Sequence, residues 1–214
     1  TRAELSEGTL KLVQDILPAN VSCIYIRQAE ALGLGHAVLC AKPVVGDEPF
    51  AIILADDMID GGQHGAMEQM VRLFNETHSS VLGVETVARE ETGSYGIVEV
   101  ASDERGHAKV SSIVEKPHPD VAPSTLAVVG RYILPGSIFD KLLEVRPGAG
   151  GEIQLTDGIA ALLKEHPVHA LPLPGTRYDC GSKLGYLKAS VDYALKHHEV
   201  GAAFAHWLRA HPAR

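Results

Sequence analysis

The sequence has few of the features that mark membrane, disulfide-rich or nucleic-acid-binding proteins. Its longest apolar runs, such as FAIILA at residues 50–55, are about one strand long and too short to span a membrane. The three cysteines are an odd number without metal-ligand spacing, which indicates reduced thiols. The net charge is −8 and Lys and Arg do not cluster, which disfavours a nucleic-acid backbone as partner.

The first residues lack the basic-then-apolar order of an export signal. Residues 1–17 (TRAELSEGTLKLVQDIL) instead follow the pattern of an amphipathic helix end, and we expect a cytoplasmic protein. The chain has 214 residues, of which 45% are hydrophobic and 21% charged. This composition suits one compact domain over residues 1–214.

Apolar segments alternate with helical patterns in the first third of the chain. Strands are expected at residues 21–27 and 48–56, the second of them buried, and helices at residues 35–45 and 65–78. This order is typical of βαβ units. We therefore predict an α/β fold with a mixed, mostly parallel sheet that helices cover on both faces.

Strands dominate the middle of the chain and helices its end. Four strands, expected at residues 79–88, 95–101, 107–117 and 126–135, would extend the sheet with hairpins or antiparallel members. Helices should follow at residues 137–147, 152–166 and 183–198, with one strand at residues 168–175.

The C-terminal helical patterns carry more specific expectations. Ser137 and Asp140 have capping-box spacing at a helix start. One face of the helix at residues 183–198 is apolar, with Leu184, Leu187, Val191 and Leu195. A last apolar face has Phe204, Trp207 and Leu208, for which packing on the chain's own domain is favoured over packing on a partner.

Residues 30–38 (EALGLGHAV) raise the question of a dinucleotide-binding turn, because two glycines stand one residue apart. Val38 occupies the place of the third glycine of that fingerprint, and the acidic residue about twenty positions on, Asp56, ends a strand. A strand-to-helix turn in which glycines relieve backbone strain is therefore favoured.

Charged side chains stand at the ends of several expected elements. Asp56 ends a strand, where open α/β sheets bind ligands and a carboxylate can hold Mg²⁺; a solvated turn is the alternative. Glu115 can accept hydrogen bonds from sugar hydroxyls, and the ammonium group of Lys116 can bind a phosphate. An exposed ion pair at the end of a strand has the same pattern and is the alternative. Asp179 precedes a glycine turn and a helix N-terminus, which favours anions.

Other catalytic signatures are missing. The eleven histidines are scattered, and neither H-x-x-x-H nor Cys/His pairing indicates zinc. No G-x-S-x-G motif supports a serine nucleophile.

Five stretches in order, from about residue 20 to the end, closely resemble the bacterial UTP–glucose-1-phosphate uridylyltransferases, or UDP-glucose pyrophosphorylases. They are RQAEALGLGHAVLCAKPVVGDEPFAIILADD, GSYGIVEV, VEKPHPDVAPSTLAVVGRYILP, GAGGEIQLTDGI and DCGSKLGYLKASVDYALKHH. The resemblance implies the Rossmann-like fold of the sugar nucleotidyltransferases. It also implies Mg²⁺-assisted transfer of UMP from UTP to glucose 1-phosphate, with release of pyrophosphate, by a homo-oligomer.

The resemblance further implies roles for individual residues. In this resemblance, Gln28 and Gly33 would contact the uracil edge, and Asp56 and Asp179 would hold Mg²⁺. Glucose 1-phosphate would be bound by Glu115, Lys116 and the backbone of Gly96 and Val128. Asp56, Lys116 and Asp179 would thus be the catalytic residues. No individual roles follow for Glu152, Gln154 or Asp157.

One hallmark of this family has no counterpart in the sequence. It is the G-x-G-T-R-x-x-P-x-T-K turn that grips the triphosphate; the GTR at residues 175–177 lacks the flanking residues and is interpreted as coincidence. We therefore expect a domain whose N-terminal strands are missing, and which is marginal or associates by itself. The alternatives are a truncated, inactive sugar-nucleotide-binding protein and a relative that uses dTTP or ATP.

Overall fold

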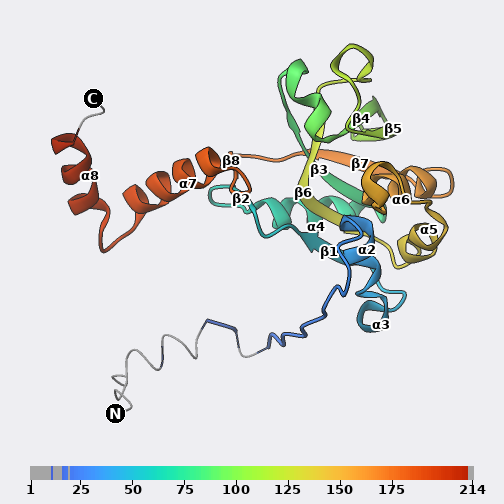
Figure 1. Ribbon diagram of the computed structural model, residues 1–214, viewed down its shortest axis with the longest axis horizontal. Coiled ribbons are helices and arrows are strands. Elements are labelled where there is room, and N and C mark those ends of the chain that lie inside the picture. The colour runs from blue at the N-terminus through green and yellow to red at the C-terminus, as the bar shows by residue number, and fades with distance from the viewer. Residues whose placement is uncertain (1–10, 12–15, 19, 212–214) are drawn as a thin grey trace.

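The computed structural model describes residues 11, 16–18 and 20–211 (Figure 1). Most of the amphipathic segment expected at residues 1–17 therefore lies outside the described residues. None of the helices in the described ranges is both long enough and apolar enough to cross a membrane.

Helices and strands alternate along the described chain. The α-helices are α2 (Leu34–Leu39), α3 (Lys42–Val45), α4 (Ala66–Thr77), α5 (Ile138–Glu144), α6 (Leu155–Leu162), α7 (Lys183–Lys196) and α8 (Gly201–Ala210). The strands are β1 (Phe50–Ile53), β2 (Asp57–Asp60), β3 (Ser80–Thr86), β4 (Gly96–Ser102), β5 (Ala108–Glu115), β6 (Leu126–Leu134), β7 (Val168–Pro172) and β8 (Thr176–Asp179). Short 3₁₀ helices are η1 (Arg89–Ser94), η2 (Pro119–Val121) and η3 (Ala149–Gly151).

A six-stranded sheet in the order β1-β6-β3-β7-β5-β4 forms the centre of the fold, and β2 and β8 form a separate antiparallel pair. The α/β fold with a mixed sheet is confirmed, including the antiparallel hairpin of β4 and β5. The expectation of a mostly parallel sheet is wrong for the described strands, since β3–β7 is their one parallel pairing. The reason is that β6 lies between β1 and β3 and runs antiparallel to both.

Helices cover both faces of the sheet, because neighbouring strand residues point to opposite sides. Val81 and Ile133 pack against Met70 and Leu73 of α4 on one face. On the other face, the next residues along these strands, Leu82 and Leu134, join a larger core with α5 and α6. The helices predicted at residues 65–78 and 152–166 therefore lie, as α4 and α6, on opposite faces of the sheet.

Two early strand predictions need correction. Residues 21–27 form no strand, and no strand of the described chain pairs with them. An extended segment becomes a strand only when a neighbour satisfies its backbone groups. β1 does form, but Ile53 is 56% exposed, so the strand is half-exposed rather than buried.

The helix at residues 35–45 is divided into α2 and α3, and the capping box at Ser137 is absent. Ser137 has helical backbone angles (φ −60°, ψ −14°) instead of the extended angles of an N-cap, and its side chain makes no cap hydrogen bond. Asp140 instead accepts a hydrogen bond of 2.7 Å from Lys42 Nζ, which ties α5 to α3.

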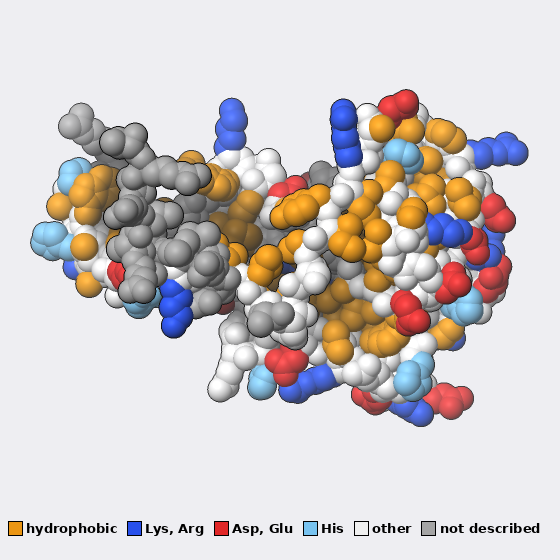
Figure 2. Space-filling model, turned by 90° about the horizontal axis from the view of Figure 1, so that it is seen from below, with side chains coloured by type: hydrophobic (Ala, Val, Ile, Leu, Met, Phe, Trp, Pro, Cys, Tyr) orange, Lys and Arg blue, Asp and Glu red, His pale blue; other side chains and the backbone are white. Residues whose placement is uncertain are grey.

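Helices α7 and α8 project from the body as an arm (Figure 1). The apolar face predicted on α7 is largely uncovered, since Leu184 and Leu187 are 62% and 59% exposed. On α8, the rings of Phe204 and Trp207 stack with centroids 6.0 Å apart, and this helix packs on α7. Hydrophobic side chains thus reach the surface on both the arm and the body (Figure 2).

Candidate active site

A pocket of about 330 Å³ lies where several strands end or begin. Six of the eight residues to which the resemblance assigns a role line it. These are Asp56 after β1, Gly96 at the start of β4, Glu115 at the end of β5, Lys116 after it, Val128 in β6 and Asp179 at the end of β8. Folding therefore gathers groups that are up to 123 positions apart in the sequence (179 minus 56).

Asp56 and Asp179 are brought together by the short ladder of β2 and β8. Asp57, the first residue of β2, pairs in register with Asp179, and the N–H of Cys180 donates to the carbonyl of Asp56 at 2.7 Å. A Cβ built on Gly181 would lie 3.0 Å from Asp56 Oδ2 and 3.1 Å from Asp179 Oδ1, so both carboxylates converge on this glycine. Two exposed carboxylates that face the same space are a donor set that suits Mg²⁺.

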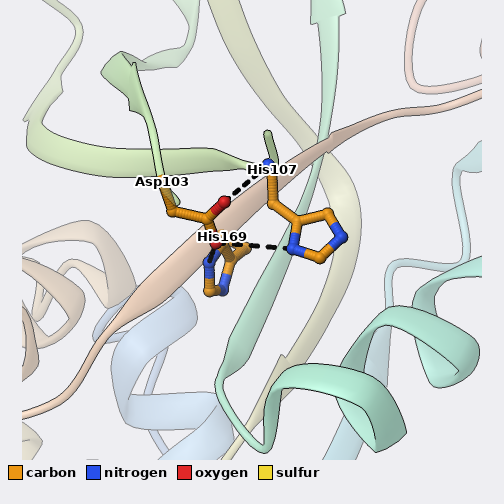
Figure 3. Close-up of side chains that lie close together, drawn as sticks. All are labelled: Asp103, His107 and His169. Atoms are coloured by element: carbon orange, nitrogen blue, oxygen red, sulfur yellow. Dashed lines mark hydrogen bonds and ion pairs between the residues drawn. The ribbon is translucent and has the colours of Figure 1, made fainter. Parts of the chain in front are cut away.

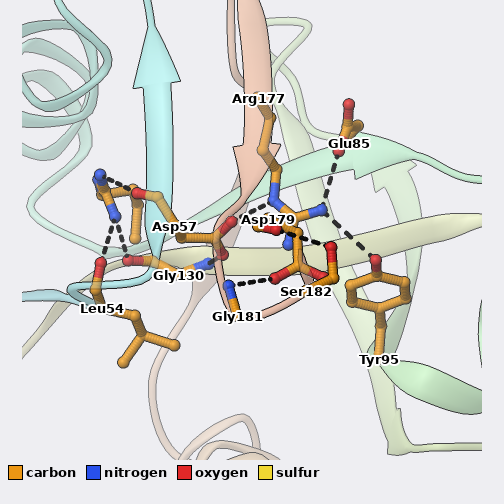
Figure 4. A network of polar contacts seen from close by, with 10 residues as sticks. Leu54, Asp57, Glu85, Tyr95, Gly130, Arg177, Asp179, Gly181 and Ser182 are labelled. Carbon is orange, nitrogen blue, oxygen red and sulfur yellow. Dashed lines mark hydrogen bonds and ion pairs between the residues drawn. The ribbon is translucent and has the colours of Figure 1, made fainter. Parts of the chain in front are cut away.

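Asp57 has a different role from its neighbour, because it is 7% exposed and engaged in the fold. Its Oδ2 accepts from the N–H of Gly130 at 2.8 Å, and its Oδ1 accepts from Nε of Arg177 (Figure 4). The guanidinium of Arg131 donates to the carbonyls of Asp57 and Gly130 at 2.6 and 2.8 Å. These contacts bind β2, β6 and β8 together directly behind Asp56.

Arg177 is the main pocket residue that the sequence interpretation missed. Besides Asp57, its guanidinium approaches Glu85 Oε2 at 3.4 Å and the hydroxyl of Tyr95 at 3.5 Å (Figure 4). Burial lowers the pKa of Arg177, but the hydrogen bonds to Asp57 and Tyr95 outweigh this effect and raise it. The GTR at residues 175–177 is therefore no phosphate-binding turn, yet its arginine is a permanent cation in the pocket wall.

Glu115 and Lys116 form another part of the pocket wall. The hydroxyl of Thr156 donates to Glu115 Oε2 at 2.5 Å, and Lys116 Nζ lies 3.6 Å from Glu115 Oε1. A Cβ on Gly96 would lie 3.3 Å from Thr156 and 3.4 Å from Glu115 Oε2, so a glycine keeps this corner open. Thr156 was not singled out from the sequence, since no motif distinguishes a helix-start threonine that supports a distant carboxylate.

The backbone of Lys116 is strained. Its φ of +44° is left-handed, a region that costs a residue with a side chain roughly 1–3 kcal/mol. The N–H of Lys116 donates to the carbonyl of Tyr95 at 2.9 Å, and buried Pro117 follows. Strain of this kind persists where surrounding structure enforces it, often at functional sites.

Three further buried or partly buried side chains, Tyr132, Glu152 and Gln154, line the pocket. Burial, with the nearby charges of Glu115 and Asp57, raises the pKa of Tyr132, which keeps its phenol protonated. Gln154 Nε2 donates to Glu152 Oε2 at 2.9 Å, and both residues line the pocket. Asp157 is exposed and is not part of the lining.

Gln28 and Gly33 lie beside each other next to the pocket rather than in its wall. Gln28 Nε2 donates to the carbonyl of Gly33 at 3.1 Å and lies 2.9 Å from His36 Nδ1. Gly33 has a φ of +93°, and a Cβ there would lie 2.9 Å from both Glu152 Cβ and the carbonyl of Ile153. The turn therefore requires glycine for close packing, and the next residue, Leu34, enters the pocket lining.

Comparisons with known proteins identify the family of the chain. A family model described as nucleotidyl transferase matches residues 2–196. The chain is 45% identical over 203 residues to the UTP–glucose-1-phosphate uridylyltransferase of Escherichia coli (strain K12), a match that covers 92% of this chain and 67% of the relative. A relative of the same name from Bacillus subtilis (strain 168) is 45% identical, with 94% and 67% covered.

Solved structures are similar as well. A UTP-bound UGPase from Acinetobacter baumannii has a TM-score of 0.85 and 42% identity, with 95% of this chain and 70% of that chain covered. A UDP-glucose pyrophosphorylase complexed with UDP-glucose has a TM-score of 0.78 and 42% identity, with 81% and 66% covered. The chain therefore belongs to the nucleotidyl transferase family and, within it, to the UTP–glucose-1-phosphate uridylyltransferases.

Proposed function

We propose that this chain transfers UMP from UTP to glucose 1-phosphate and releases UDP-glucose and pyrophosphate. The observation that carries the proposal is that Asp56 and Asp179 line the same pocket as Glu115 and Lys116. The names of its relatives support the same pair of substrates, since one solved structure is UTP-bound and another contains UDP-glucose.

The protein's contribution to this reaction is alignment and charge neutralisation. An oxygen of glucose 1-phosphate attacks the α-phosphorus of UTP, and no protein nucleophile is needed because the attacking phosphate is already an anion. Lys116 would offset the repulsion between the two approaching phosphates, while Glu115, held by Thr156, accepts hydrogen bonds from sugar hydroxyls. The backbone of Gly96 and Val128 would complete the sugar subsite.

We propose Mg²⁺ as the metal held by Asp56 and Asp179, whose converging oxygens are the ligands that this ion prefers. When bound, the ion would neutralise phosphate charge and polarise the α-phosphoryl group. Arg177 and Arg131 bond Asp57 and so keep it, and with it the β2–β8 ladder, in place.

The uracil edge would be recognised by the turn that contains Gln28 and Gly33, next to Leu34 of the pocket wall. We also propose a cytoplasmic location, because nucleoside triphosphates are cytoplasmic metabolites. A homo-oligomer is supported by the uncovered apolar face of α7, where Leu184 and Leu187 are exposed.

A two-part experiment tests the function. Pyrophosphate release should require the chain, UTP, glucose 1-phosphate and Mg²⁺ together, and calorimetry should detect binding of UDP-glucose. Binding without any release would contradict the transferase and favour the sugar-nucleotide-binding alternative. Faster release with dTTP or ATP than with UTP would contradict the assignment of the base.

Thr156→Val should raise the KM for glucose 1-phosphate roughly tenfold, since a hydrogen bond to a charged group contributes on the order of 1.5–3 kcal/mol. The variant keeps the shape of the side chain but removes the donor to Glu115. We expect a smaller change in kcat and in the KM for UTP. Thr77→Val is the matched control, because this hydroxyl donates to Leu73 within α4. An unchanged KM for the sugar phosphate would refute the role of Thr156.

A further inference from the structure

A second group of polar side chains lies far from the pocket, at the other end of the β4–β5 hairpin (Figure 3). Asp103 and His107 belong to the turn between these strands, and His169 belongs to β7. Gly96 and Glu115, at the opposite end of the hairpin, line the pocket. Seven residues of strand separate the two ends by roughly 20 Å.

The hairpin turn orients the carboxylate of Asp103. Its Oδ1 accepts from the backbone N–H groups of Arg105 and His107 at 2.9 and 2.7 Å. These two bonds, with the contacts to the histidines, outweigh burial and lower the pKa of Asp103 to about 2. Oδ1 is therefore used by the turn, and Oδ2 faces the two imidazole rings.

Both histidines approach this one oxygen. Asp103 Oδ2 lies 3.2 Å from His169 Nε2 and 3.4 Å from His107 Nδ1. One possible ligand atom from each of the three residues lies within 4.8 Å of the other two. With bond lengths of about 2.0–2.2 Å to nitrogen and oxygen, ligands of a tetrahedral zinc ion are roughly 3.4 Å apart. The two distances from Asp103 Oδ2 to the histidine nitrogens are already close to this value.

Within the described chain, one buried nitrogen of this group has no hydrogen-bond partner. His107 Nδ1 is buried and has no hydrogen-bond partner there, despite its position 3.4 Å from Asp103 Oδ2. The other nitrogen of the same ring, Nε2, lies 3.5 Å from Glu76 Oε1 of α4. A carboxylate on the far nitrogen of a ligating histidine is the usual outer contact of a zinc site, and it leaves Nδ1 free for the metal.

His169 supplies the buried side of the group, since its side chain is 6% exposed. The side chains of Asp103 and His107 are 20% and 23% exposed, so the group can be reached from solvent. Nearby charged residues include Glu76, Arg105 and Lys109, the register partner of His169. The guanidinium of Arg105 donates to the carbonyl of Glu76 at 3.5 Å.

We propose that Asp103, His107 and His169 form a binding site for a zinc-class divalent ion, with water in the fourth position. Two imidazoles and one carboxylate are ligands that Zn²⁺ prefers over the all-oxygen sets of Mg²⁺. The ion would join the hairpin turn to β7, beside Lys109–His169, the single described register pair of β5 with β7. This site is separate from the pocket of the proposed function and does not depend on it.

Calorimetric titration of metal-stripped protein with Zn²⁺ tests the proposal. We expect one ion per chain, and Co²⁺ in its place should give the visible absorption of a tetrahedral complex. Asp103→Asn, which can still accept the two turn hydrogen bonds, and His107→Gln should each weaken Zn²⁺ binding at least tenfold. His169→Gln should do the same.

Two matched controls separate this site from other metal binding. His118→Gln and His198→Gln change exposed histidines and should leave the affinity unaltered. Asp56→Asn should also leave Zn²⁺ binding unaltered, whatever it does to UMP transfer. The proposal would be overturned if the parent protein bound no stoichiometric Zn²⁺. It would also be overturned if Asp103→Asn and His107→Gln, with the circular dichroism of the parent, bound Zn²⁺ as tightly as the parent does.

Discussion

Asp56→Asn is expected to slow UMP transfer by a factor on the order of 10² to 10³, the usual loss for one preorganised electrostatic contact. The change keeps the size of the side chain but removes the charge that, with Asp179, would hold Mg²⁺ against the phosphates. The rate of pyrophosphate release at saturating UTP and glucose 1-phosphate measures the effect. Asp179→Asn should have a similar effect, because both carboxylates face the same space beside Gly181.

Asp47→Asn is the control for this prediction, since Asp47 is exposed and lies outside the pocket lining. It should leave the rate unchanged. UDP-glucose binding should be measured on the same variants. A rate in Asp56→Asn within a factor of two of the parent would exclude Asp56 from the metal site.

Arg177→Met is expected to lower the free energy of unfolding by about 3–5 kcal/mol. The side chains of Arg177 and Asp57 are only 13% and 8% exposed, so removal of the cation leaves a carboxylate buried without its partner. Urea denaturation followed by circular dichroism measures the change. The double variant Asp57→Asn/Arg177→Met should recover part of the loss, because it no longer buries an isolated charge.

Arg72→Met is the matched control, because it removes an exposed ion pair where Arg177→Met removes a buried one. Arg72 bonds Glu68 one turn away on α4, and both side chains are largely in solvent, at 65% and 46% exposure. Its loss should change the free energy of unfolding by no more than about 1 kcal/mol. Equal effects of the two arginine variants would show that the network around Asp57 does not stabilise the fold.

The helices and central strands were predictable because their signals are local. The apolar periodicity at residues 65–78 and 152–166 corresponds to α4 and α6, and the alternating or apolar runs at residues 79–88 and 126–135 correspond to β3 and β6. The strand predicted at residues 21–27 failed because strand formation depends on a neighbour that a local pattern does not contain. The capping box failed because Ser137 has helical backbone angles, and Asp140 bonds Lys42, almost a hundred residues earlier in the chain.

Part of the candidate site was predictable for the same reason. Asp56 follows and Glu115 ends an apolar strand, and strand ends are where α/β sheets bind ligands. Asp179 was singled out because it precedes a glycine turn and the N-terminus of a helix. Arg177 and Thr156 carry no such signal, since their importance comes from partners on other elements, Asp57 and Glu115.

The sequence by itself determined the family, most helices and strands, and the carboxylates and lysine proposed for the chemistry. These properties depend on residue types in order, which similarity and periodicity detect directly. Only the tertiary structure decided the mixed direction of the sheet, the meeting of Asp56 with Asp179, and the grouping of Asp103 and His107 with His169. Each of these depends on contacts between segments distant in the chain, and such contacts form only when the core orders those segments against one another.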